Sequence, residues 1–135
     1  MSSLQAFLHP IQVEDKEVIV SNRFVEDGKP VPFVIRPITQ EENRAIMKKF
    51  TKHDKKKGIE TFERPEYVAA LTAAGVVFPD LKNAELQKAY GVLGEAAVLQ
   101  KMLYAGEFAE LAQAVQDLSG LEEDINEEIE EVKNE

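Results

Sequence analysis

Residues 18–42, VIVSNRFVEDGKPVPFVIRPITQEE, decide the fold because they place two β-type runs around a turn and then open a helix. The runs Val18–Val25 and Val31–Ile38 are rich in β-branched residues, which predicts two strands. Between them, Asp27 and Gly28 supply the positive φ that a tight hairpin turn needs. Prolines in and beside the second run cannot donate ladder hydrogen bonds, so that strand should be short or lie at an edge.

A helix follows the second run directly. Thr39 and Glu42 have the spacing of a capping box, in which each side chain accepts a hydrogen bond from the other residue's backbone N–H. The box predicts a helix over Gln40–Lys52, with Ile46 and Phe50 four residues apart on one face.

The middle of the chain predicts a loop and a second helix. We expect His53–Glu60 to be a loop because most of its residues are charged. Pro65 suits the first turn of a helix. Apolar residues spaced four, three and four apart then continue from Tyr67 to Phe78, where Pro79 ends the run.

Short helices also fill the rest of the chain up to residue 120. Residues typical of helix boundaries separate them: Asn83, Gly91, Gly94, Gly106 and Gly120. They predict one helix over about 83–91 and another over about 94–106. The apolar residues of 108–118 have the strongest helical period in the chain.

The predicted fold class is therefore α+β and mostly α, with an N-terminal β-hairpin packed on a bundle of four to five short helices and an acidic C-terminal tail. We expect residues 1–16 to form an N-terminal arm, 17–120 a single domain and 121–135 an amphipathic tail. A chain of 135 residues can bury roughly two-thirds of its unfolded surface, which is enough to form a stable core without disulfides or bound metals.

The composition excludes several classes of protein. The chain has no cysteine, which rules out disulfides, thiolate metal sites and cysteine nucleophiles, and fits a reducing compartment. No apolar run approaches the roughly 18 residues of a membrane span, so no membrane partner is expected. The first ten residues lack the basic start and apolar stretch of a secretory signal. We expect a cytoplasmic protein.

The negative charge is concentrated at the C-terminal end. Residues 122–135 hold eight acidic residues against Lys133, a net −7 of the −9 carried by the whole chain. A narrow apolar stripe runs through this segment with spacings of four, four and three: Leu121, Ile125, Ile129 and Val132. Because like charges repel along a helix, we expect the tail to be ordered only where its stripe meets a surface. The stripe is our candidate partner-binding site.

Residues 44–57 have the opposite charge, with seven basic residues against Asp54, a net +6. The candidate docking patch consists of six lysines: Lys48, Lys49, Lys52, Lys55, Lys56 and Lys57. Such a cluster could neutralise several phosphates, but Phe50 is its only aromatic residue and offers no stacking platform. A solubilising loop, or a docking surface for the acidic tail of this or a neighbouring chain, competes with a nucleic-acid site, which the sequence disfavours.

The residues that catalysis requires are mostly missing. The two histidines, His9 and His53, lie in the arm and in the lysine cluster. A nucleophile triad needs its base beside Ser or Thr and an orienting acid, and neither histidine has that setting. Gly91–Gly94 has the spacing of a nucleic-acid-binding GxxG loop, but it encloses apolar residues and precedes Glu95, which would repel phosphate. The tail acids lack the spacing of a calcium loop. We therefore assign no catalytic, cofactor-binding or metal-binding residue and expect no enzyme.

Two stretches resemble a known family. The first combines SNRF (21–24), DGKPVPF (27–33), IRPIT (35–39) and EE (41–42). The second, more specific, combines FPDLK (78–82), AELQ (84–87), YGVLG (90–94), ML (102–103), GEF (106–108) and Leu111. In order and spacing they resemble the XkdN-like tail assembly chaperones of contractile-tail phages and defective prophages. The likeness covers about residues 4–120 and carries little signal in 51–63 or beyond Gly120.

The resemblance implies a non-catalytic chaperone that acts in the bacterial host cytoplasm and is absent from the mature virion. Such proteins bind the tape measure protein, keep it soluble and help the tail tube protein assemble around it. The stripe of the tail could then cover an apolar groove or lie beside the client. A small structural tail or baseplate protein and a nucleic-acid regulator using residues 44–57 remain alternatives. A homo-oligomer, the client-binding face and a longer frameshifted product stay open.

Overall fold

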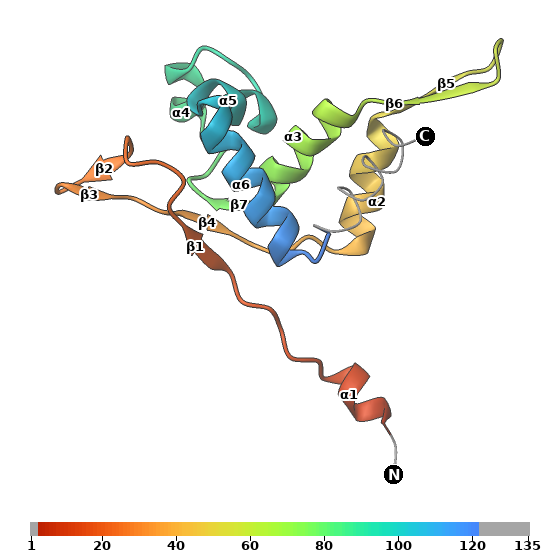
Figure 1. Cartoon of the computed structure of the whole chain (residues 1–135), viewed down its shortest axis with the longest axis horizontal. Coiled ribbons are helices and arrows are strands. Elements are labelled where there is room, and N and C mark those ends of the chain that lie inside the picture. The colour runs from red at the N-terminus through yellow and green to blue at the C-terminus, as the bar shows by residue number, and fades with distance from the viewer. Residues whose placement is uncertain (1–2, 122–135) are drawn as a thin grey trace.

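A three-stranded antiparallel sheet in the order β1-β4-β7 lies at the centre of the fold (Figure 1). The structure is a computed structural model and describes residues 3–121. Its strands are β1 (Lys16–Val18), β4 (Phe33–Ile35) and β7 (Val76–Phe78). In register, Val18 faces Phe33 on one side of β4, and Val34 faces Phe78 on the other. Strands distant in sequence therefore share one sheet.

The predicted turn at Asp27 and Gly28 is confirmed. It joins β2 (Val25–Glu26) to β3 (Lys29–Pro30), and both turn residues have positive φ, 52° and 76°. The first predicted strand, Val18–Val25, is interrupted, because Val18 belongs to β1 of the sheet and Val25 to β2 of the small hairpin. The second, predicted over Val31–Ile38, is reduced to β4, which is short as expected but lies in the middle of the sheet. Pro32 and Pro37 flank β4 and have no N–H to donate, as expected, so the second run forms one short strand.

The capping box at the start of α2 (Gln40–Lys49) is also confirmed. The Glu42 N–H donates to Thr39 Oγ1 at 3.2 Å, and the Thr39 N–H donates to Glu42 Oε1 at 3.1 Å. The helix ends earlier than the predicted Lys52 because the chain enters a strand at Thr51.

The charged loop predicted over residues 53–60 is wrong, because these residues belong to a β-hairpin. Strands β5 (Thr51–Asp54) and β6 (Ile59–Phe62) pair antiparallel and project away from the body (Figure 1). β-branched Thr51, Ile59 and Thr61, together with Phe62, favour this form. At the turn, Asp54 Oδ1 accepts from the Lys56 N–H at 3.0 Å, and Gly58 has a φ of 64°.

The second predicted helix is α3 (Arg64–Gly75), with Pro65 in its first turn as expected. Its predicted continuation to Phe78 is wrong: residues 76–78 form β7 instead. The β-branched pair that follows Gly75 favours a strand, and β4 supplies an edge with which this strand can pair.

Three further helices complete the body: α4 (Ala84–Ala89), α5 (Glu95–Met102) and α6 (Ala105–Leu118). Asn83 caps α4, accepting from the Leu86 N–H at 2.9 Å, as predicted. Gly106 does not end α5 but lies in the first turn of α6. The positive φ of Gly120, 74°, agrees with its expected place after that helix.

A short helix, α1 (Leu4–Leu8), lies in the N-terminal segment, which extends away from the body in Figure 1. Large apolar side chains of this segment are exposed, including Phe7 at 80% and Ile11 at 98%. Within residues 3–121, no helix is both long enough and apolar enough to cross a membrane.

The core lies between the sheet and helices α3, α5 and α6. Its fully buried side chains include Ile35, Leu71, Leu99, Leu111 and Val115. Helix α2 joins this core through a hydrogen bond from the Tyr67 hydroxyl to Asn43 Oδ1. The fold is therefore α+β and mostly helical, as predicted, and in the described part of the chain its body holds five helices besides α1.

Candidate binding groove

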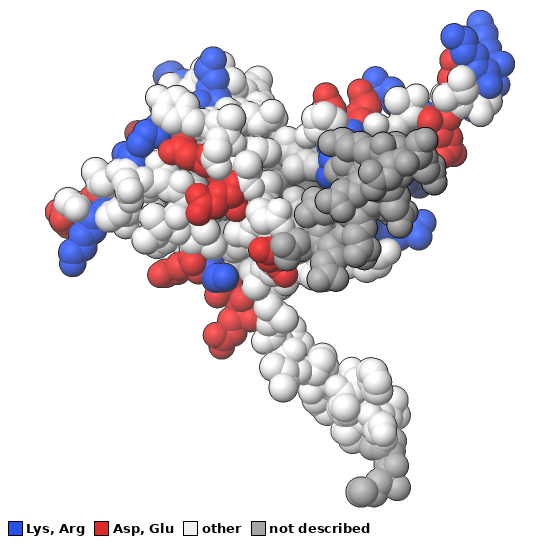
Figure 2. All heavy atoms as spheres, in the orientation of Figure 1, with Lys and Arg blue, Asp and Glu red and all other residues white. Residues whose placement is uncertain are grey.

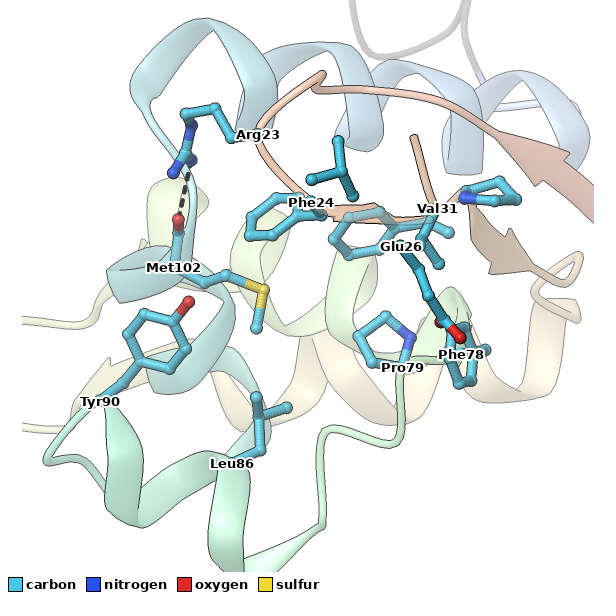
Figure 3. Close-up of a pocket in the computed structure, with 12 residues that line it drawn as sticks. Arg23, Phe24, Glu26, Val31, Phe78, Pro79, Leu86, Tyr90 and Met102 are labelled. Atoms are coloured by element: carbon cyan, nitrogen blue, oxygen red, sulfur yellow. Dashed lines mark hydrogen bonds between the residues drawn. The ribbon is translucent and has the colours of Figure 1, made fainter. Parts of the chain in front are cut away.

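An apolar groove of about 490 Å³ opens between the β2–β3 hairpin, the end of β7 and helices α4 and α5 (Figure 3). Most of the side chains that line it are apolar: Phe24, Val25, Val31, Pro32, Phe33, Phe78, Pro79, Leu86, Tyr90 and Met102. Arg23 and Glu26 are the charged residues of this lining. The groove can therefore bind an apolar surface, and its lining shows no paired acid and base.

Long-range packing positions both walls of the groove. On the hairpin side, Phe24 contacts Phe33 edge to face, with ring centroids 6.0 Å apart. On the helical side, Leu86 and Tyr90 lie one turn apart at the end of α4. Figure 3 shows Phe24, Met102, Leu86 and Pro79 converging on the hollow.

A second hollow of about 460 Å³ extends the apolar surface past the first. The two hollows share Phe78, Pro79 and Leu86, and the second adds Ala89 with polar residues at its edge. Part of the rim is well exposed: Phe78 by 49% and, on the hairpin, Val25 by 57%. Apolar side chains that remain accessible on the rim of a groove mark an interaction surface.

Arg23 attaches the hairpin wall to the helices. Its guanidinium donates to the Met102 carbonyl oxygen at 3.0 Å and forms an ion pair with Glu107 at the start of α6. It also lies over the rings of Tyr104 and Phe24, 4.3 and 4.9 Å from their centroids. The hydrogen bonds from Arg23 lower the pKa of the Glu107 carboxyl to about 2, so the pair stays charged at neutral pH.

Comparison with known proteins identifies the family of this chain. The profile of the Phage XkdN-like tail assembly chaperone proteins matches residues 4–133, nearly the whole chain. The chain belongs to this chaperone family. The match includes every element that lines the groove.

Two relatives from Bacillus subtilis (strain 168) align over most of the chaperone. Protein XkdN of the phage-like element PBSX is 28% identical over 129 residues, which cover 92% of this chain and 87% of the relative. Protein YqbN is 29% identical over the same shares of both chains. The crystal structure of YqbN superposes with a TM-score of 0.72 at 26% identity, covering 85% of the chaperone and 94% of YqbN.

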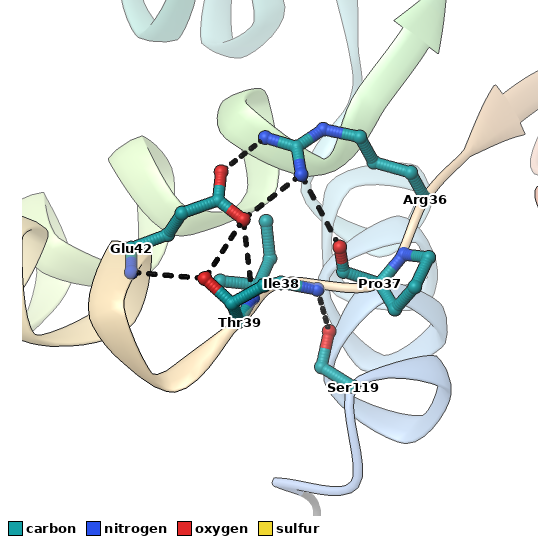
Figure 4. A network of polar contacts seen from close by, with 6 residues as sticks. All are labelled: Arg36, Pro37, Ile38, Thr39, Glu42 and Ser119. Atoms are coloured by element: carbon teal, nitrogen blue, oxygen red, sulfur yellow. Dashed lines mark hydrogen bonds and ion pairs between the residues drawn. The ribbon is translucent and has the colours of Figure 1, made fainter. Parts of the chain in front are cut away.

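A polar network fixes helix α2 of the chaperone beside the end of α6 (Figure 4). Arg36 Nη1 donates to Glu42 Oε1 at 3.0 Å, and the Ile38 N–H donates to Ser119 Oγ at 2.8 Å. The hydrogen bond from Arg36, followed by the one from the Thr39 N–H, lowers the pKa of Glu42 to about 2. The capping box thus also joins strand β4 to helix α2.

The six lysines of the predicted docking patch lie on three elements. Lys48 and Lys49 end α2, Lys52 lies in β5, and Lys55, Lys56 and Lys57 form the turn of the projecting hairpin. Figure 2 shows the basic side chains gathered at that tip. Acidic residues lie close to two side chains of the hairpin, with Lys52 Nζ 3.4 Å from Glu63 and His53 Nδ1 3.1 Å from Glu60.

Only the first residue of the predicted apolar stripe is among the described residues. Leu121 is half-buried and packs against the core, and its N–H donates to the Gln116 carbonyl oxygen at 2.8 Å. Ile125, Ile129 and Val132 lie outside the described residues. The stripe therefore stays a prediction.

The sequence analysis did not assign the groove residues to a site. Arg23, Phe24 and Tyr90 belong there to the residues that carry the family resemblance, and Phe78 and Pro79 also mark the end of a predicted helical run. Their shared signal was aromatic and proline residues in two separate stretches, but only the β4–β7 pairing brings those stretches together. Within residues 3–121, the structure shows no cluster of three or more metal-ligating side chains.

Proposed function

We propose that this protein is a non-catalytic chaperone that binds the tape measure protein in the host cytoplasm, before the tail is complete. It keeps that long client soluble, helps the tail tube protein assemble around it and is absent from the mature virion. Membership of the tail assembly chaperone family supports a partner among tail proteins. The apolar groove is the observation that carries the binding step.

The groove has the chemistry that an apolar-faced helix needs. A helix that presents residues at spacings of three and four can insert a few large side chains into such a hollow. Each large apolar side chain that becomes buried contributes about 1.5–3 kcal/mol, and ordering and lost freedom offset part of that gain. A few such anchors give affinity that is useful but reversible, as a client that must later be released requires.

The exposed N-terminal segment supports the same function. Phe7, Leu8, Ile11 and Val13 are all exposed and lie outside the core of the body. They offer a second apolar surface for a long client, separate from the groove. The acidic tail, with its net charge of −7, would keep the complex soluble.

The test is an affinity purification of the tagged chain from cells with the tail genes induced. Mass spectrometry should identify a long tape measure protein bound to the chain, and purified particles should lack the chain. Recovery of nucleic acid without a tape measure, or retention of the chain in particles, would overturn the proposal.

Matched variants then test the groove. Val25→Glu and Phe78→Glu, made separately, place a charge on its exposed rim and should each strongly reduce tape measure recovery. The control is Leu93→Glu, because Leu93 is 90% exposed and does not line the groove. Circular dichroism confirms that each variant is folded. Equal recovery with all three variants would show that the client binds elsewhere.

A further inference from the structure

A basic face runs along α2 and continues into the β5–β6 hairpin. We define it by Arg44, Lys48, Lys49 and Lys52 together with the three lysines of the turn, 55–57. A hollow of about 690 Å³ lies along this face, with Gln40, Arg44, Met47, Lys48 and Thr51 among its lining. The spacing of these residues places them along one side of α2, with exposed Met47 between the charges.

Most of this positive charge has no acidic partner in the described part of the chain. The lysine and arginine ion pairs formed within residues 3–121 use Lys52 from this region, but not Arg44, Lys48, Lys49 or the lysines of the turn. Concentrated like charge raises the energy of the folded body, so an acidic segment that covers this face would stabilise it.

The acidic segment of the same chain starts next to this face. Ser119 Oγ accepts from the Ile38 N–H at 2.8 Å, two positions before α2 begins at Gln40. Leu121, half-buried against the core, is the last described residue. Residues 122–135, with a net charge of −7, therefore follow a point beside the start of α2, and residues 44–57 carry a net +6.

The dimensions of the two segments also match. In helical form, the stripe from Leu121 to Val132 would be about 17 Å long, close to the length of about 15 Å of α2 from Gln40 to Lys49. Running parallel to α2, the acids around residues 127–131 would come beside Lys48 and Lys49. Even an extended tail, at about 3.3 Å per residue, would reach the hairpin.

We propose that the acidic segment 122–135 docks in cis on the basic face of α2 and the β5–β6 hairpin. The stripe would place its apolar side chains in the hollow around Met47, and the acids on either side would pair with the lysines. This contact involves elements other than those that line the groove, so it does not depend on the tape measure proposal.

Paramagnetic relaxation on the full-length protein tests this contact. The chain has no cysteine, so Asn134→Cys creates a unique site for a nitroxide label near the C-terminal end. Amide signals of residues 44–57 should lose intensity severalfold when the label is oxidised. Raising the salt from about 0.1 M to about 1 M shortens the screening length from about 10 Å to about 3 Å and should restore much of that intensity.

Charge variants in the labelled background supply the matched control. Lys48→Gln, Lys49→Gln and Lys52→Gln together should restore the signals of the basic face. The same number of changes at other exposed lysines, Lys82→Gln, Lys88→Gln and Lys101→Gln, should leave the broadening unchanged. Equal effects of the two triple variants would overturn the proposal.

Two further outcomes would also overturn it. Broadening of signals from the apolar groove instead of the basic face would place the tail in the client site. A mixture of isotope-enriched chain without a spin label and spin-labelled chain at natural isotope abundance tests for contact between copies. Broadening of the enriched chain in this mixture, equal to that of the doubly labelled sample, would make a second copy the occupant. Cis docking requires broadening that is independent of protein concentration.

Discussion

The close crossing of α3 and α6 at Gly75 gives a quantitative test of the packing that positions the groove. A Cβ atom added at Gly75 would lie 2.6 Å from Val115 Cγ1 and 3.0 Å from Val115 Cγ2. Val115 is fully buried, so its side chain has little room to move. Gly75 immediately precedes β7, whose last residue, Phe78, forms the rim of the groove.

We expect the sign of the Gly75→Ala effect to depend on Val115. Overpacking of a dense core costs about 1–3 kcal/mol, against a gain of up to about 1 kcal/mol from replacing glycine in a helix. In the wild-type background, Gly75→Ala should therefore lower the free energy of unfolding by about 1–2 kcal/mol. Val115→Ala alone should lower it by about 2–3 kcal/mol, through lost burial and a cavity.

In the Val115→Ala background the clashing methyl groups are gone, so Gly75→Ala should raise the free energy of unfolding by about 0.5–1 kcal/mol. Urea unfolding of the four proteins, followed by circular dichroism, completes the double-mutant cycle. The coupling energy should be about 2 kcal/mol and favour the double variant. An equal effect of Gly75→Ala in both backgrounds would refute the steric explanation.

Three other predictions follow from single contacts. The pKa of Glu42 is about 2 in the folded protein, below its ordinary 4.5, so the pair with Arg36 contributes stability above about pH 4.5 that is lost as the pH falls toward 2. In urea unfolding at a series of acidic pH values, Glu42→Gln should therefore lose less unfolding free energy over this range than wild type. Arg23→Ala should speed amide hydrogen exchange in residues 24–31 while α3 amides stay protected, because it frees the hairpin wall from α5 and α6. Gly58→Ala should loosen only the β5–β6 hairpin, by about 1 kcal/mol, because alanine strains at the φ of 64°; unchanged exchange in β5 and β6 would contradict this.

Local chemistry made part of the fold predictable. The capping box at Thr39 and Glu42, the Asp27-Gly28 turn and the Asn83 cap each depend on residues close in sequence, and all are confirmed. The helical spacing from Tyr67 to Phe78 gave a wrong helix end. Phe78 has the expected spacing, but α3 ends at Gly75 and Phe78 belongs to β7. Strand β7 exists because β4 offers it an edge, and no local pattern reveals that pairing.

The same limit explains why the groove could not be assigned in advance. Its lining comes from residues 23–33, from 78–90 and from Met102, which the sheet and the Arg23 contacts bring together. An apolar groove was expected of a chaperone, but the sequence could not say which apolar residues stay exposed. Phe33 is buried in the sheet, whereas Phe78, paired to the same strand, is half exposed on the rim.

The placement of the two candidate surfaces favours a division of tasks within the chain. The groove depends on the hairpin wall, β7, α4 and α5, whereas the basic face belongs to α2 and the projecting β5–β6 hairpin. Apolar contacts weaken little with salt, whereas contacts between exposed charges weaken strongly. Client binding through the groove should therefore persist at a salt concentration that releases the acidic tail. A single salt titration that follows both client recovery and tail contact would separate the two surfaces, and parallel loss of both would show that they act as one.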